Sequence, residues 1–463
     1  MLRALPERFA AAVREVVGPK HVRGDAVSLN AYGQDALGKG HPPDLVVVPA
    51  ATQEIAAIAR LCNEHGVPLV VRGAGTGYTG GAVPTRGGVV VSMERLNHIL
   101  DIDQTNLLAV VEPNVITADL QRAVETVGLF YPPDPASLET SSIGGNVAEC
   151  AGGPRAFKYG TTKHYVLALE AVLPTGEIVR TGSKAVKNVV GYDLTRLLVG
   201  SEGTLAIITK VTLRLIPKPP ARATLLALFA DVQTAVNGVT ALIERRVVPA
   251  ALELVDADSL SAVNDYLGEE VVPLGTGAVL IVESDGMQAA VDDEIDRVAD
   301  ACREAGASRV SLAAREDDRD RLWNARRLLS ASLKATGLLK INHDVVVPRG
   351  RVPDLFGVIQ TIKKDFGLRI AAFGHAGDGN IHVNLMVDRA DPWQLAQAVT
   401  AERVLFERVV ALEGSISGEH GIGFAKAPYI SIELSPEEIA LMKRVKTAFD
   451  PNGILNPGKI FPA

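Results

Sequence analysis

The chain has 463 residues, of which 47% are hydrophobic and 22% are charged, as is usual for a globular protein. A chain of this length is too long to fold around a single hydrophobic core, so we expect two or three domains. The net charge of −7 argues against nucleic-acid binding as the main activity.

Targeting signals and cysteines set further limits. Residues 1–8 lack the apolar core of a signal peptide, and no run approaches the roughly 18 apolar residues that a membrane helix needs. We therefore expect a cytoplasmic protein that reaches the inner membrane only through a partner.

Cys62, Cys150 and Cys302 are far apart in the sequence, which predicts reduced thiols. They are also too few for an iron–sulfur cluster, which usually needs about four thiolates.

The elements of the N-terminal part are predicted from apolar periodicity and turn residues. We expect strands over 44–48, 68–72, 88–93, 107–112, 167–173 and 177–181, and a long strand ending at Ile216. We expect helices over 52–65, ended by Gly66, and over 117–127, ended by Gly128. The turn-rich stretch 142–160 is expected to form a loop lined by backbone. Residues 217–220, Pro-Lys-Pro-Pro, are predicted to be a linker.

The loop after strand 68–72 contains five glycines between Gly73 and Gly81. Its glycine spacing matches a Rossmann dinucleotide site, and Glu94 lies near the place of the ribose-binding acid. That motif requires a helix at the glycines, which Pro84 and the glycines at 87 and 88 prevent. We therefore reject the Rossmann interpretation. The bare N–H groups of such a loop can still bind a pyrophosphate without a helix. The alternative, a glycine-rich turn between strands, is hard to reconcile with five glycines in nine residues.

Beyond the linker, helices and strands alternate. The predicted helices are 231–246, 287–305, 316–336, 351–366 and 393–413, and the predicted strands are 250–255, 277–283, 308–312, 339–347, 369–373 and 381–387. This order suits an antiparallel sheet with helices on one face.

The last two strands predict a β-hairpin with Asp378-Gly379 as its central turn residues. In that register His375 faces His382, with Cβ atoms about 5 Å apart, and Asn384 lies on the same face. A polar turn with two unrelated histidines is the alternative. The opposition of the two imidazoles favours a metal pair.

Two other pairs of polar residues are candidates for the functional site. Paired arginines such as Arg326 and Arg327 usually lie on a solvated helix face, but an inward Arg326 would clamp a carboxylate. Glu419 and His420 stand between glycines, which favours a functional loop over an ordinary surface loop.

Several motifs together resemble one known family. They are Arg-Gly-Ala-Gly-Thr-Gly at 72–77, Pro-Pro-Asp-Pro at 132–135, Ile-Gly-Gly-Asn at 143–146, Gly-Tyr-Asp-Leu-Thr at 191–195 and Gly-Ser-Glu-Gly-Thr-Leu at 200–205. The chain resembles the vanillyl-alcohol-oxidase-type flavoproteins from end to end. The similar branch holds the glycolate oxidase FAD subunit, the cytochrome-type D-lactate dehydrogenases and D-2-hydroxyglutarate dehydrogenase. The resemblance implies an α+β protein. Residues 1–217 would form a two-part FAD domain, 218–413 an α+β cap domain with an antiparallel sheet, and 414–463 a helical segment that returns to the flavin.

The resemblance also implies the cofactor contacts. The residues that it assigns to FAD are Arg72, Gly73, Ala74, Gly75, Thr76, Gly77, Pro133, Asp134, Ser137, Gly144, Gly145, Asn146, Gly153, Tyr159, Gly160, Glu202, Gly203, Ile207 and Asn456. Many relatives carry a histidine in the first loop that bonds covalently to the flavin. Thr76 stands at the nearest position here, which implies non-covalent FAD. Two positions depart from the family pattern: Ala206 replaces the usual Gly, and Cys150 replaces the expected Asn or Thr.

The implied reaction is the oxidation of a D-2-hydroxy acid of the glycolate or D-lactate type to a 2-oxo acid, with hydride transfer to flavin N5. His375, His382 and Glu419 are the expected ligands of a divalent Zn, Mn or Fe ion that acidifies the substrate hydroxyl. His420 is the expected general base. Arg326 and Lys340, with Ser330 as a weaker match, would bind the carboxylate, and Asn384 would contact the hydroxyl or the carboxylate.

Three interpretations of the electron path stay open. The chain could be a dehydrogenase that passes electrons to a quinone, a cytochrome, an electron-transfer flavoprotein or an iron–sulfur subunit. It could be an oxidase that reduces oxygen directly. It could also be the FAD subunit of a multi-subunit glycolate oxidase, with little activity alone. The sequence does not choose between a homodimer and a hetero-complex.

Overall fold

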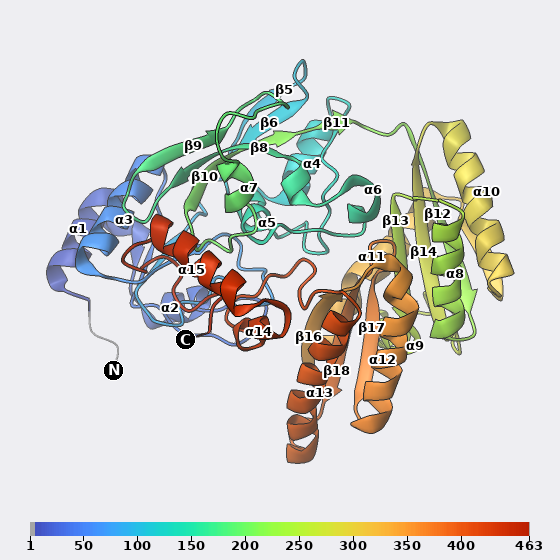
Figure 1. Ribbon diagram of the computed structural model, residues 1–463. Helices are drawn as coiled ribbons and strands as arrows, with labels where there is room; N and C mark the ends of the chain where they lie inside the picture. The colour runs from blue at the N-terminus through green and yellow to red at the C-terminus, as the bar shows by residue number, and fades with distance from the viewer. Residues whose placement is uncertain (1–4, 463) are drawn as a thin grey trace. The chain divides into compact units, whose positions relative to one another are not determined.

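The computed structural model describes residues 5–462, which form two compact units (Figure 1). The first unit consists of Met1–Gly152, Thr161–Lys218 and Glu419–Ala463, and the second of Gly153–Gly160 and Pro219–Gly418. Each unit is described by itself. Residues 1–4, the start of the segment considered for a signal peptide, lie outside the described range. No helix within residues 5–462 is both long and apolar enough to cross a membrane.

The first unit contains a four-stranded sheet with strand order β1-β2-β4-β3. Its strands are β1 (Val22–Arg23), β2 (Leu45–Val47), β3 (Leu69–Arg72) and β4 (Val89–Ser92), and the pairs β2–β4 and β3–β4 are parallel. Helix α3 (Thr52–His65) connects β2 to β3 and ends where Gly66 adopts a left-handed conformation with φ 62°, as predicted. Its apolar face packs with α1 (Glu7–Val17) and the sheet in one core.

The second large sheet of this unit is antiparallel and has five strands in the order β5-β6-β10-β8-β9. Its strands are β5 (Ile99–Asp103), β6 (Leu108–Val111), β8 (Val166–Val172), β9 (Ile178–Gly182) and β10 (Ile207–Arg214). The short strands β7 (Leu129–Phe130) and β11 (Ile216–Pro217) pair with each other. The remaining helices are α2 (Ala26–Tyr32), α4 (Thr117–Glu125), α5 (Ile143–Glu149), α7 (Leu194–Leu198), α14 (Ile430–Glu433) and α15 (Pro436–Phe449).

The predicted loop over 142–160 is wrong in two places. Ser142 caps helix α5, because its hydroxyl accepts the Gly145 N–H at 3.3 Å, and a short helix α6 (Ala156–Tyr159) follows. The glycines at 144 and 145 had argued for a loop, but helix propensity is a weak guide where a cap and tertiary packing act together. Helix α5 ends at Cys150, which has φ 55°. Asn tolerates this left-handed conformation better than most residues, so of the expected Asn or Thr it is Asn that suits this backbone.

The second unit is built on a seven-stranded antiparallel sheet with strand order β15-β12-β14-β13-β17-β18-β16. Its strands are β12 (Ala221–Phe229), β13 (Ala251–Asp256), β14 (Ala278–Gly286), β15 (Arg309–Ala313), β16 (Leu339–Val346), β17 (Arg369–His375) and β18 (Asn380–Val387). Its main helices are α8 (Val232–Glu244), α9 (Ala257–Leu267), α10 (Gln288–Glu304), α11 (Glu316–Ala335), α12 (Val352–Asp365) and α13 (Pro392–Ala411).

Helices cover both faces of this sheet, so the prediction of helices on one face is wrong. Val279 and Ile281 of β14 share a core with residues of α9 and α11. Leu280, which points to the other face, lies against α8 at Gly238. In Figure 1, α8 and α10 run together beside β12 and β14. An uninterrupted apolar strand such as β14 has two faces to bury, which is why one layer of helices does not suffice.

Candidate functional site in two parts

The histidine hairpin forms, but its register differs from the predicted one. His375 pairs with Asn380, and His382 pairs with Phe373, so the loop spans 376–379 rather than two residues. The expected direct opposition of His375 and His382 is therefore wrong. The shift moves each partner by two residues, and a shift by an even number keeps every side chain on its face. The two imidazoles are thus diagonal neighbours, with ring centroids 5.4 Å apart and planes at 86°.

The same face of the sheet carries the other predicted polar residues of this unit. Asn384, two residues after His382, pairs with Asn342 of β16, and the Asn342 side-chain amide donates to Asn384 Oδ1 at 2.8 Å. Lys340, two residues before Asn342, follows on the same face of β16 and donates a hydrogen bond to the Ser330 hydroxyl of α11. The strand register therefore gathers ammonium, amide and imidazole groups on one surface.

Arg326 points inward from α11, as predicted, whereas Arg327 is exposed. Its guanidinium lies over the Phe373 ring, 4.9 Å from the centroid, and forms a buried ion pair with Glu253. Only 5% of Arg326 is exposed and none of Glu253. The other oxygen of Glu253, Oε1, accepts from His375 Nδ1 at 2.6 Å. One carboxylate therefore joins the two residues that were predicted separately as clamp and ligand.

The charge of Glu253 is set by its neighbours. Burial alone raises its pKa, but the charges of Arg326 and His375 and their hydrogen bonds outweigh burial and bring the pKa to about 2. Lys340 shows the opposite balance. Burial, with a smaller effect from the charge of Lys334, lowers its pKa to about 7.

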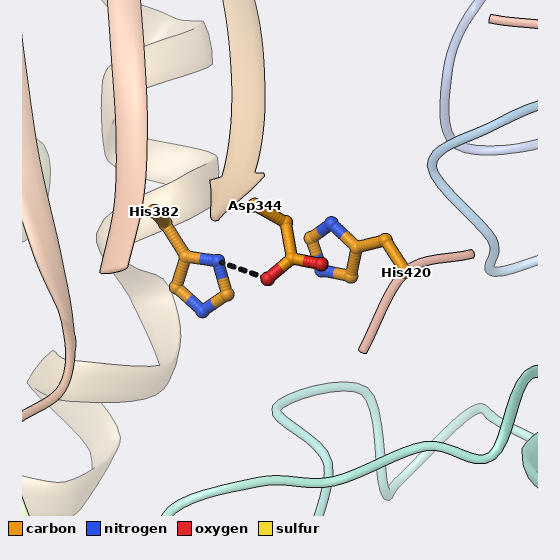
Figure 2. A group of neighbouring side chains, drawn as sticks. All are labelled: Asp344, His382 and His420. Carbon is orange, nitrogen blue, oxygen red and sulfur yellow. Dashed lines mark ion pairs between the residues drawn. The ribbon is translucent and has the colours of Figure 1, made fainter. Parts of the chain in front are cut away.

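His382 has a carboxylate of its own. Asp344 pairs with His382 across β16 and β18, and Asp344 Oδ1 lies 3.8 Å from His382 Nδ1. Figure 2 shows this imidazole turned toward the carboxylate; His420, also drawn there, belongs to the first unit. The same carboxylate accepts from the Asn380 amide at 2.6 Å and from the Gly418 N–H at 2.9 Å. Asp344 thus links the hairpin to the turn that directly precedes Glu419.

His420 is held from several sides within the first unit. Its ring stacks on Tyr78, with centroids 5.3 Å apart and planes at 23°, and its carbonyl accepts from the Thr79 hydroxyl. Its Nε2 lies 3.9 Å from Glu419 Oε1. The next turn is fixed by Glu202, whose two carboxylate oxygens accept the N–H groups of Ile422 at 2.7 Å and Gly423 at 2.6 Å.

The first glycine loop leaves its backbone donors available. Within the described residues, none of the N–H groups from Gly73 to Gly77 donates a hydrogen bond to the protein. Arg72 folds its guanidinium back over Gly75, which has φ 71°, so a Cβ at this glycine would collide with it. Gly73 lies against the Ser142 hydroxyl at the start of α5.

Several other residues assigned to FAD form hydrogen bonds or packing contacts with the protein itself. Asn146 donates to the Thr117 hydroxyl at 2.6 Å, and Tyr159 donates to Asp285 at 2.8 Å. Asn456 donates to the carbonyls of Gly81 and Glu202, and Ile207 is buried in the core. The Pro133 carbonyl accepts from Gln121, and Gly144 packs against Pro113. Asp134 and Ser137 are partly buried, and the segment 153–160 clusters with the second unit.

Comparison with known proteins decides the family. Residues 218–460 match the pattern of "FAD linked oxidases, C-terminal domain", and residues 43–182 match "FAD binding domain". The chain belongs to the FAD-linked oxidase family. It is 42% identical to the glycolate oxidase subunit GlcD of Bacillus subtilis (strain 168), over 96% of this chain and 95% of that protein. It is 36% identical to the D-lactate dehydrogenase of Anaerostipes hadrus, over 96% and 95%.

Solved structures confirm the expected fold class. The chain matches p-cresol methylhydroxylase with a TM-score of 0.82 at 19% identity, over 98% of this chain and 96% of that one. A 4-ethylphenol oxidase from Gulosibacter chungangensis gives 0.79 at 23% identity, over 98% and 97%. The protein is therefore an FAD-dependent oxidoreductase with a fold of the vanillyl-alcohol-oxidase type.

The first loop of this FAD-linked oxidase fits a pyrophosphate. Unused N–H groups next to the partly buried guanidinium of Arg72 are the donors that bind such an anion without a helix. The histidine pair fits a divalent ion in the chemistry of its donors, because a carboxylate on Nδ1 of His375 leaves Nε2 as the ligand atom.

Sequence reasoning missed Glu253 and Asp344. Glu253 lies within the apolar run Ala-Leu-Glu-Leu-Val (251–255), and Asp344 lies between two other buried residues of β16. A lone acid in a buried strand is costly unless it is paired, and this rule was the available signal.

Proposed function

We propose that this FAD-linked oxidase converts a 2-hydroxy acid of the glycolate or D-lactate type into the 2-oxo acid. The proposal rests on one observation: Arg326, Lys340, Asn384 and the histidine pair lie on one side of a single sheet. Positively charged groups on the same face as two imidazoles suit a small anion with a neighbouring hydroxyl. The names of the relatives, a glycolate oxidase subunit and a D-lactate dehydrogenase, support the same substrate class.

Two bound groups would supply chemistry that side chains lack. FAD accepts a hydride, and a divalent Zn, Mn or Fe ion binds substrate oxygens and makes a hydroxyl more acidic. His375, His382 and Glu419 would hold the ion. Glu419 follows Gly418, whose N–H is fixed by Asp344, and this anchor restricts where the Glu419 backbone starts.

The protein's own groups bind and orient the acid. The Nε and Nη2 atoms of Arg326 face Glu253, which leaves Nη1 for the substrate carboxylate. Lys340 adds a second positive charge when it is protonated. The Asn384 amide donates to the Ala371 and His382 carbonyls at 3.1 Å, so its position is fixed by the hairpin itself.

His420 would take the proton of the substrate hydroxyl. The Tyr78 stack, the Thr79 hydroxyl and the Glu202 clamp hold the imidazole and its turn in one orientation, which a general base requires. Its loss should nearly abolish flavin reduction while metal and FAD stay bound.

Thr76 supports non-covalent FAD, because its hydroxyl does not form the bond that a histidine makes to the flavin. Denaturation of the protein should release all flavin into the supernatant; flavin retained on the polypeptide would contradict this.

The name of the Bacillus subtilis relative, a subunit, favours electron delivery to partner chains. In this second interpretation the chain reduces its flavin when alone but turns over only with an added acceptor. Steady peroxide production in air would instead indicate an oxidase.

One experiment tests the proposal. The FAD-loaded protein is mixed without oxygen with glycolate and with D- and L-lactate while flavin absorbance is followed. We expect bleaching with glycolate or D-lactate, none with L-lactate, and none with any acid after chelation. Retention of full bleaching in metal-free protein would remove the metal from the proposal, and no bleaching with glycolate or with D-lactate would remove the substrate class.

A further inference from the structure

We propose that Glu253 is a positioning residue that fixes the tautomer and the ring orientation of His375 for metal binding. This inference rests on the proposed metal site and names a residue that carries part of its affinity. Glu253 would touch neither the metal nor the substrate.

The strand register places Glu253. It stands directly opposite His375 in the antiparallel pair β13–β17, and His375 is the last residue of β17 before the hairpin loop. Both side chains point to the same face, and the contact between Glu253 Oε1 and His375 Nδ1 is 2.6 Å. The pairing of backbones therefore aims the carboxylate at one particular nitrogen.

The chemistry of the two groups then selects the tautomer. An ionised carboxylate only accepts hydrogen bonds, so Nδ1 must carry the proton and Nε2 keeps its lone pair. Nε2 is the ring nitrogen that Glu253 does not contact, and the His382 ring lies nearby, with the two ring centroids 5.4 Å apart. A carboxylate behind a histidine ligand also increases the basicity of the ligand and holds its plane.

Arg326 stabilises the buried carboxylate of Glu253. Its guanidinium binds Glu253 Oε2 and lies over Phe373, so a positive charge balances the carboxylate without competing for Oε1. The carboxylate divides its two oxygens between the two partners. A merely structural ion pair needs no histidine on its second oxygen.

Glu283 offers a matched control in the same sheet. It lies on the same face of β14, is 4% exposed, and accepts from Thr224 at 3.1 Å and from Trp323 at 2.9 Å. It pairs with Ala251, two residues before Glu253. Glu283→Gln therefore removes a buried carboxylate charge from the same layer, but contacts no histidine.

The test measures metal affinity rather than turnover. Metal-free full-length protein with FAD bound is titrated with Zn²⁺ and with Mn²⁺ by calorimetry, for the wild type, Glu253→Gln and Glu283→Gln. We expect Glu253→Gln to weaken binding about 10- to 100-fold, the range for the loss of such an outer partner, and Glu283→Gln to leave it unchanged. In a His375→Ala background, Glu253→Gln should add no further loss, because its effect passes through that ring.

Different failures have different meanings. Wild-type affinity in Glu253→Gln, with a loss in His375→Ala, overturns the positioning role and leaves the proposed metal site intact. Unchanged affinity in His375→Ala overturns the metal site itself. An equal loss in Glu283→Gln, or an additional loss on top of His375→Ala, also overturns the inference. If Glu253→Gln does not fold, Glu253→Asp keeps the charge but shortens the reach. A wild-type affinity in that variant would overturn the positioning role as well.

Discussion

Asp344 and Gly418 are joined by a hydrogen bond of 2.9 Å, from the Gly418 N–H to Asp344 Oδ2. The bond fixes the turn from which Glu419 and His420 follow. The space beside it is full, because a Cβ on Gly418 would collide with the Asn380 side-chain amide and lie 3.1 Å from Asp344 Oδ1. The turn therefore depends on the absence of a side chain at this position.

Gly418→Ala should disturb catalysis more than folding. The methyl group displaces the turn, and a misplacement of about 1 Å at a reacting group can cost up to a hundredfold in rate. We expect anaerobic flavin reduction to slow by about tenfold or more, with FAD content unchanged. Gly357→Ala is the control, because its Cβ would lie in open space within α12. Equal rates for the two variants would show that the anchored turn does not position the reacting groups.

Periodicity and turn residues predicted most elements of the second unit to within a few residues, since its helices are long and bounded by clear signals. Helix 316–336 is observed as α11 (Glu316–Ala335). Its first turn carries Glu316, Asp317 and Asp318, the charges that favour a helix start. Helix α9, directly after β13, was not predicted. Its cap, Asp256, was available as a signal, since its side chain accepts the Ser259 N–H.

The histidine hairpin shows what a local pattern leaves open. Asp-Gly suggested a two-residue loop, whereas the observed loop spans 376–379. Within this loop Gly379 has φ 87° and lies against the carbonyl of Val347, the residue after β16, so packing against this segment favours the wider turn. The shared face of His375 and His382 was nevertheless predicted correctly, because that relation depends only on even spacing.

The partners of the histidines could not be predicted in this way. Glu253 lies 122 residues before His375 and Asp344 lies 38 before His382, and strand order alone brings them together. A single sequence does not specify which strands are neighbours. What it offered was two acids within strands, whose charges needed partners somewhere in the fold.

Arg326→Ala should destabilise the protein as well as weaken substrate binding. Removal of one member of a buried ion pair leaves Glu253 as an uncompensated charge, which typically costs about 3–5 kcal/mol. We expect a lower midpoint of denaturant unfolding and a higher KM for the hydroxy acid. Arg327→Ala, at the exposed neighbour, should leave both near wild type. If Arg326→Ala leaves KM unchanged, Arg327 rather than Arg326 would be the residue that binds the substrate carboxylate.

Lys340 should make substrate affinity depend on pH. Burial lowers its pKa to about 7, so the ammonium is present below this pH and is lost as the pH rises through it. Because the substrate is an anion, its binding should weaken above pH 7, with KM rising by up to about tenfold per pH unit. The check is KM between pH 6 and 9 at a saturating electron acceptor, with kcat separated from KM so that His420 does not obscure the result. Lys340→Arg keeps its charge throughout this range and should give a flat KM profile. A flat profile in the wild type, or the same rise in Lys340→Arg, would exclude Lys340 as the group that controls binding.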